Sequence, residues 1–192
     1  MKGNYEIVVV GTSSGGTKTL RQIFSVLPPD FILPICVIQH LHPLQKSAAI
    51  VKFHENCKIP LKEATDKEPI MAGHIYIAPP NYHLLIEDGR YLALSVDAKV
   101  NFSRPSIDVL FDSAVDVYGQ KIIGIILTGA NHDGSQGLHT IARVGGCTIV
   151  QDPETAKVPA MPLAALARTQ ADYILPPDKI GHLLTQLAQD NE

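Results

Sequence analysis

A glycine-rich turn near the N-terminus places two serines where a hydroxyl could act as a nucleophile. The stretch GTSSGGTKT begins at Gly11, and its opening Gly11-Thr12-Ser13-Ser14-Gly15 matches the G-x-S-x-G pattern of a nucleophile elbow. In that pattern Ser13 occupies the apex, and Ser14 supplies a hydroxyl or a backbone N–H to an oxyanion hole. A serine hydroxyl is a weak nucleophile until a neighbouring base accepts its proton, so this chemistry requires a base elsewhere in the chain.

The same turn is a poorer match to a phosphate-binding loop. Gly11 and Gly16 have the spacing of G-x-x-x-x-G-K-[ST], but Thr17 stands before Lys18. The dinucleotide pattern G-x-G-x-x-G also fails, because Ser13 occupies its second glycine position. These mismatches disfavour a nucleotide-binding protein. The remaining alternative for the serines is structural, with a hydroxyl that caps the following helix.

A base and an acid follow two other predicted strands. His40 comes directly after the apolar run at residues 35–39, and Asp133 follows the run at 122–127. Imidazole titrates at a pKa of about 6.5, which suits a general base near neutral pH. A carboxylate on the other ring nitrogen would fix the tautomer and stabilise the imidazolium. Because sites in parallel sheets form at the carboxyl ends of strands, we expect Ser13, His40 and Asp133 to form a catalytic triad.

Two other kinds of protein remain as alternatives. His40, His42, His132 and Asp133 could ligate zinc in a metal-dependent hydrolase. His42 precedes Pro43 in a predicted loop, however, and attack by a serine needs no metal, so we expect neither a metal nor a cofactor. A receptor-binding module of the same fold, without turnover, is the other alternative.

The elements that must position these residues alternate between strands and helices. This pattern predicts an α/β fold, a mostly parallel, doubly wound (Rossmann-like) sheet with helices on both faces. The predicted strands are 6–10, 35–39, 122–127, 147–150 and 173–175, and the predicted helices are 16–26, 47–54, 106–117, 137–144, 164–168 and 177–189.

The middle of the chain departs from this alternation. Within residues 70–96, Asp88-Gly89 separates two apolar runs, which is a strong signal for a hairpin. We expect a small antiparallel region at one edge of the sheet. The length of 192 residues and the lack of a linker predict a single domain spanning 1–192.

Composition excludes several classes of partner. A net charge of −3 without a basic run gives no electrostatic support for binding nucleic acid. No apolar stretch approaches the roughly 20 residues of a membrane span, so we expect no membrane insertion. Three widely spaced cysteines predict buried thiols in a reducing compartment rather than a disulfide framework. We therefore expect a cytoplasmic protein.

Six stretches also match a known family in its own order and cover most of the chain. They are VVGTSSGGT (9–17), VIQHLHP (37–43), AGHIYIAPPNYH (72–83), RPSIDVLFDS (104–113), GIILTGANHDGSQGL (124–138) and AMP (160–162). On these motifs the sequence resembles the catalytic domain of the chemotaxis receptor methylesterases, the CheB family. The family's fold, a parallel α/β sheet with a small antiparallel portion, agrees with the pattern above.

The resemblance implies an activity and residue roles. Ser13 corresponds to the nucleophile, His40 to the general base and Asp133 to the acid that orients it. The family hydrolyses glutamate γ-methyl esters on the cytoplasmic helices of chemoreceptors, releasing methanol, and many members also deamidate receptor glutamines. An oxyanion donor is expected from the backbone N–H of Ala130, where the family often has methionine.

Further expectations follow from the matching stretches. His83 and Arg104 are candidates for the border of the substrate cleft, the alternatives being a structural hydrogen bond and a surface charge. Asn131 and His132 are expected to shape the loop rather than to catalyse. Typical members carry an N-terminal receiver domain, whereas this sequence starts at the catalytic strand, so we expect no receiver domain and consider a separate receiver protein acting in trans.

Overall fold

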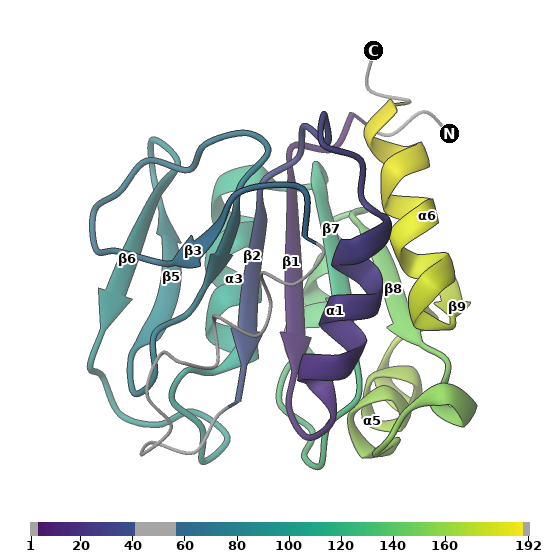
Figure 1. The fold of residues 1–192 in the computed structure, drawn as a ribbon. Helices are drawn as coiled ribbons and strands as arrows, with labels where there is room; N and C mark the ends of the chain where they lie inside the picture. The colour runs from purple at the N-terminus through teal and green to yellow at the C-terminus, as the bar shows by residue number, and fades with distance from the viewer. Residues whose placement is uncertain (1–3, 41–56, 190–192) are drawn as a thin grey trace.

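A seven-stranded parallel sheet forms the centre of the protein (Figure 1). The computed structural model describes residues 4–40 and 57–189. The strand order is β3-β4-β2-β1-β7-β8-β9, and every neighbouring pair is parallel. The strands are β1 (Ile7–Thr12), β2 (Ile35–Gln39), β3 (Leu61–Glu63), β4 (Ile75–Ile77), β7 (Ile122–Ile126), β8 (Cys147–Gln151) and β9 (Tyr173–Leu175). The predicted fold class is confirmed.

Helices cover both faces of this sheet, which explains why its central strands β1, β2 and β7 are buried at every position. Val8 and Val10 of β1 pack into one core, whereas Ile7 and Val9 pack into the other. The first core lies under α1 (Gly16–Val26) and α6 (Pro177–Gln189). The second lies under α3 (Ile107–Tyr118), α4 (Ser135–Arg143) and α5 (Ala160–Arg168).

The chain changes direction across the sheet between β1 and β7. From β1 it continues to β2 on one side, and from β7 it continues to β8 on the other. Such a switch point opens a crevice at the carboxyl ends of the strands. The segments after β1, β2 and β7, which carry the predicted triad, all leave the sheet at this end.

The predicted hairpin is present, but its place in the fold was predicted wrongly. Strands β5 (His83–Glu87) and β6 (Tyr91–Ser95) form a separate antiparallel sheet rather than an edge of the main one. Leu84 and Ile86 of β5 share the core of α3. Residues 75–77, also expected in the antiparallel region, form β4 of the parallel sheet. A short buried apolar run has the same pattern in either setting, so the sequence did not determine its partner.

Helices α1 and α6 have the predicted bounds, and the other described helices are shifted at their starts. Helix α5 begins at Ala160, four residues earlier than predicted, and it tolerates Pro162 because the proline lies in the first turn, where a missing N–H costs little. Helix α4 begins at Ser135, two residues earlier than predicted. The predicted helix 47–54 lies outside the described residues. Over the ranges 4–40 and 57–189, no helix is long and apolar enough to cross a membrane.

Candidate active site

Ser13 lies directly after β1 at the start of a tight turn into α1. Its backbone N–H donates to Thr128 O at 3.0 Å, and its carbonyl accepts from Gly16 N at 2.9 Å. Gly15 adopts a φ of +90°, a left-handed conformation that turns the strand into the helix. Ser13 is half-buried and Ser14 is exposed. The G-x-S-x-G stretch therefore has the strand–turn–helix setting of a nucleophile elbow.

The loop after β7 packs closely against this serine. A Cβ atom on Gly129 would lie 1.8 Å from Met161 Sδ and 2.9 Å from Ser13 Cβ, so only glycine fits there. Gly129 is held by hydrogen bonds from its N–H to Val158 O and from Met161 N to its carbonyl, both at 3.0 Å. The position of Ser13 thus depends on a glycine in the loop that follows a different strand, β7.

His40 follows β2 at the same level as Ser13. Thr12 pairs with Gln39 in the parallel register, and His40 N donates to Thr12 O at 3.0 Å. Ser13 and His40 are each one residue further on, where neighbouring backbones are about 5 Å apart. Gln39 Nε2 ties the two segments together by donating to Ser13 O at 2.8 Å. Among the described residues, no hydrogen bond joins Ser13 Oγ to the His40 ring.

The His40 ring is oriented by two side chains from the loop after β7. Its Nε2 lies 3.0 Å from Asp133 Oδ2, and Asn131 Nδ2 lies 3.3 Å from its Nδ1. Asn131 Oδ1 accepts from Asp133 N at 3.2 Å, which fixes the orientation of the amide. Because an amide nitrogen only donates, His40 Nδ1 accepts, and the ring proton sits on Nε2 and is donated to Asp133. The unprotonated ring nitrogen is therefore Nδ1, and it can act as a base once it exchanges the hydrogen bond from Asn131 for one from Ser13.

Asp133 is buried, with an exposed fraction of 1%, at the N-terminus of α3. Its carboxylate accepts from Ile107 N at 2.6 Å, Ser106 Oγ at 2.8 Å and Asn101 Nδ2 at 2.9 Å. Burial alone would raise its pKa, but the hydrogen bonds from His40, Asn101 and Ile107 outweigh it and hold the pKa of Asp133 below its usual value. The positive end of the α3 dipole also favours the charge. Asp133 is therefore ionised at neutral pH and suited to stabilise an imidazolium.

The residues that support Asp133 were not predicted from the sequence. Asn101 Nδ2 also donates to Asp108 Oδ2 at 2.7 Å, so one amide bridges two buried carboxylates. Asp108 Oδ1 accepts from Gly137 N at 2.7 Å, and burial raises the pKa of Asp108. A usable signal was present, because Ser106 and Asp108 are polar residues at the start of a helix that otherwise turns an apolar face to the core.

His83 and Arg104 have different positions from each other. His83 is buried, with 2% exposed, and its Nδ1 accepts from Ser106 N at 3.2 Å while its Nε2 faces Ala98 O at 3.1 Å. These hydrogen bonds make His83 a buried support for the start of α3. The expectation that His83 lies at the border of the cleft is therefore corrected. Sequence motifs do not show which side of a helix terminus a residue packs against.

Arg104 lies in the wall of a pocket of about 140 Å³ that also includes His40. Its guanidinium donates to Asp97 O and to Asn81 Oδ1, both at 2.9 Å. Through these bonds Arg104 holds together the segments that form the pocket wall. Its contact with substrate stays a prediction. The pocket is lined by His40, Asn81, Lys99, Phe102, Ser103, Arg104 and Pro105.

Two backbone donors near Ser13 have no partner in the described part of the chain. Neither the N–H of Ser14 nor that of Ala130 makes a backbone hydrogen bond there. Both residues are exposed, and Ala130 directly follows the glycine that packs against Ser13. They are the available donors for an oxyanion formed at Ser13.

Other reactive groups are poorly placed for catalysis. Burial raises the pKa of the Cys36 and Cys147 thiols to about 12, so both stay protonated at neutral pH. Cys57 is partly buried, and all three thiols are free. Residues 4–40 and 57–189 contain no group of three or more His, Cys, Asp or Glu side chains that could hold a metal ion. His132 is exposed, and His42 lies outside the described residues.

Comparison with known proteins gives the site its context. Residues 8–184 match the CheB methylesterase family, which is nearly the whole chain. The chain belongs to the CheB methylesterase family. This confirms the family that the motifs indicated, and with it the predicted class of enzyme, a hydrolase.

The relatives of this CheB-family chain differ in length. A Thermotoga maritima protein named protein-glutamate methylesterase/protein-glutamine glutaminase is 36% identical over 95% of the chain and 54% of its own length. A Leptospira interrogans relative that carries that name provisionally is 47% identical over 98% of the chain and 97% of its own length. The chain thus spans about half of the first relative and nearly all of the second.

A solved structure confirms the architecture. The crystal structure of the Thermotoga maritima CheB methylesterase catalytic domain superposes with a TM-score of 0.91 at 36% identity. The match covers 95% of this chain and 98% of that one, so the parallel sheet and the small antiparallel pair belong to the CheB fold.

Proposed function

We propose that this chain is a protein-glutamate methylesterase that hydrolyses glutamate γ-methyl esters on chemoreceptors through Ser13, His40 and Asp133. The observation that carries the proposal is the 3.0 Å contact between His40 Nε2 and a buried, ionised Asp133, one strand away from a serine elbow in a CheB fold. That contact leaves Nδ1 of His40 as the base.

The proposed reaction proceeds through an acyl-enzyme. His40 Nδ1 accepts the hydroxyl proton as Ser13 Oγ attacks the γ-carbonyl carbon, and the carbonyl oxygen becomes an oxyanion facing the N–H groups of Ser14 and Ala130. The imidazolium then protonates the departing methoxide, which leaves as methanol. A water molecule, deprotonated by the same nitrogen, hydrolyses the acyl-enzyme to glutamate and free Ser13.

Deamidation of glutamine is a second activity of the same site. The relatives' names join the methylesterase and glutaminase activities. Both reactions pass through a tetrahedral oxyanion at a γ-carbonyl, with methanol or ammonia as the leaving group. The same donors would therefore serve both.

The proposed substrate also suggests a location and a form of control. Chemoreceptors present their methylated glutamates on cytoplasmic helices, so the proposed site of action is the cytoplasm. Control by a separate receiver protein in trans stays a prediction, and binding of such a protein to the purified chain would test it.

The test is methanol release from glutamate-methylated receptor membranes, by the wild-type chain and by Ser13→Ala. Release by wild type alone supports the serine mechanism. Release by both variants would overturn the role of Ser13, and release by neither would favour a receptor-binding module without turnover. Addition of a chelator distinguishes a metal-dependent hydrolase, because a serine triad is indifferent to it.

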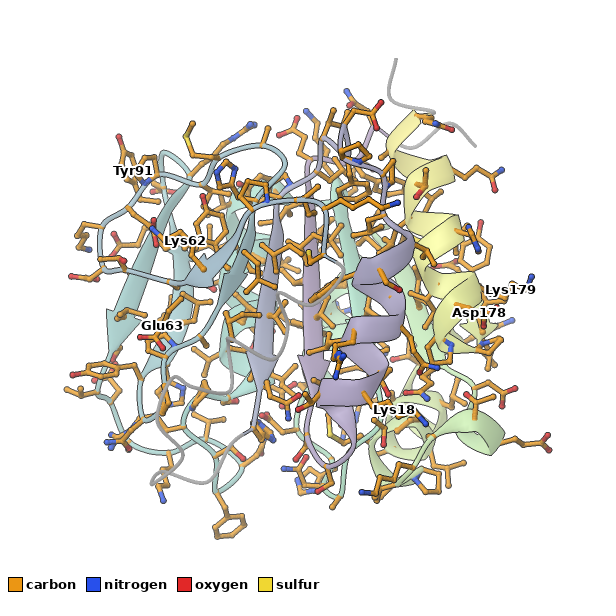
Figure 2. All side chains as sticks on the ribbon, in the orientation of Figure 1. Lys18, Lys62, Glu63, Tyr91, Asp178 and Lys179 are labelled. Carbon is orange, nitrogen blue, oxygen red and sulfur yellow. The ribbon has the colours of Figure 1, made fainter. Side chains whose placement is uncertain are left out.

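Direct titration with ATP tests the nucleotide-binding alternative. Lys18 lines a larger hollow of about 750 Å³ between the start of α1 and the start of α6, where Asp178 lies (Figure 2). We expect no tight binding of ATP, since Lys18 is out of register with the phosphate-loop pattern.

A further inference from the structure

A tight turn beside the active site holds an aromatic residue in an unusual backbone conformation. Val100 N donates to Ser103 O at 3.1 Å, and Ser103 N donates to Val100 O at 2.8 Å. The two residues between them, Asn101 and Phe102, have φ values of +50° and +61°, the signs of a type I′ turn. Asparagine suits such a turn, but a bulky residue at positive φ is strained.

The turn is anchored on the catalytic acid itself. Asn101 Nδ2 donates both to Asp133 Oδ1 and to Asp108 Oδ2, and both carboxylates are buried. This anchor fixes the turn relative to His40, whose ring also bonds Asp133. The strain at Phe102 therefore persists because the surrounding contacts determine the backbone.

Phe102 gains nothing from the fold in return. Its side chain is 94% exposed, more than any other large apolar residue in the described ranges. Val96 and Val100 of the same segment are also exposed, at 66% and 37%. A phenyl ring held in solvent by a strained, anchored turn costs stability without an internal contact in return, and contact with a partner would account for that cost.

The neighbours of Phe102 indicate what that partner is. The ring stands at the rim of the pocket that contains His40, with exposed Lys99 and the Arg104 guanidinium in the same wall. A helix that presents a γ-methyl glutamate to this pocket must lay its neighbouring side chains, one turn away, against the rim. On a helix that carries several glutamates, those side chains combine apolar stems with negative charge, which complements an aromatic ring beside two cations.

We propose that Phe102 is a specificity-determining residue that docks on the receptor helix beside the methylated glutamate. The inference rests on the proposed function, because it assigns the docking contact of the same site. It predicts that the enzyme distinguishes a receptor helix from a free glutamate ester through this ring.

The test compares Phe102→Ala, Phe102→Leu and the control Tyr91→Ala. Tyr91 is an exposed aromatic residue on β6, far from the carboxyl ends of the parallel strands (Figure 2). Methanol release is measured on methylated receptor membranes and on N-acetylglutamate γ-methyl ester. We expect Phe102→Ala to raise the KM for the receptor at least tenfold with kcat changed less than twofold, and to lose at least tenfold more on the receptor than on the small ester. Phe102→Leu should retain most of the activity on the receptor, and Tyr91→Ala all of it.

Other results would overturn the inference. Equal losses on both substrates would make Phe102 a structural part of the site, and no loss on the receptor would remove it from docking. A loss matched by Tyr91→Ala would point to a general effect of removing an exposed aromatic ring. A change in oligomeric state for Phe102→Ala would indicate that the ring contacts a second copy of the chain. In all of these cases the proposed function would stand, because the wild-type chain still releases methanol.

Binding to receptor membranes keeps the test independent of turnover. Cosedimentation of Ser13→Ala with and without Phe102→Ala reports docking alone, and we expect at least a tenfold weaker affinity without the ring. Unchanged affinity would overturn the inference. A wild type that neither binds nor hydrolyses the receptor would overturn both the docking role and the proposed function.

Discussion

The two halves of the candidate site are built in opposite ways. Asp133 is buried, and its carboxylate receives hydrogen bonds from α3, from Asn101 and from His40. These bonds fix the position and orientation of the carboxylate. Ser13 lies in a half-exposed turn, and the N–H groups of Ser14 and Ala130 beside it have no backbone partner in the described residues. The acid half is preorganised by the protein, whereas the nucleophile half is completed by the substrate.

This difference predicts that Ser13→Ala affects rate without affecting stability, whereas His40→Ala also removes a hydrogen bond to buried Asp133. Ser13→Ala and His40→Ala should each reduce hydrolysis by about 10⁴-fold or more, and the double variant should be no worse than either, because members of a triad act as a unit. Methanol release and thermal unfolding check both statements. Ser14→Ala is the matched control, with a loss below about tenfold, since its backbone donor is retained. Equal losses for Ser13→Ala and Ser14→Ala would mean that the nucleophile is misassigned.

The acid half should respond in both rate and stability. Asp133→Asn removes the charge that orients His40, which costs about 10⁴-fold in kcat by analogy with other triads. It also places an amide N–H against the donors at the start of α3, which costs about 1–3 kcal/mol of unfolding free energy. Chemical denaturation beside activity measures both effects. A stable but inactive variant would show that the hydrogen bonds to Asp133 do not hold the fold.

The contact that joins the halves lies at Gly129. Gly129→Ala should push Ser13 or Met161 aside, because its Cβ would overlap both. A displacement of about 1 Å reduces kcat by roughly 10²-fold. Adding Met161→Ala makes space and should recover part of that loss, so a double-mutant cycle is the measurement. Additive losses would indicate that Met161 is not what displaces the serine.

The smallest expected effect is a pH dependence that separates two neighbouring carboxylates. The pKa of Asp133 is lowered on folding, so its contribution to stability is present above about pH 4 and is lost as the pH falls through the folded value. The pKa of Asp108 is raised, so its contribution has the opposite sign and declines as the pH rises above about 4. Unfolding free energies between about pH 3 and 6 should show a flatter acid slope in Asp133→Asn and a steeper one in Asp108→Asn. A slope in Asp133→Asn equal to that of wild type would contradict the lowered pKa.

Local patterns were sufficient for much of this molecule. The buried runs that became β1, β2 and β7 are continuous and apolar, a pattern typical of parallel strands covered on both faces, and they put Ser13, His40 and Asp133 at one end of one sheet. The motifs around them were enough to indicate the CheB family.

The remaining features depend on contacts between distant segments. Strand β4 joins the parallel sheet, whereas β5 and β6 pack on α3 instead of extending that sheet. Both outcomes depend on packing partners that local periodicity does not encode. The bridge from Asn101 to Asp133 and Asp108, and the buried place of His83 behind α3, join residues that are separated by loops. Sequence determined which strands carry the chemistry, because strand burial is a local property of residue type. Only the tertiary structure decided how the acid is held, because hydrogen bonds between distant side chains exist only once the chain has folded.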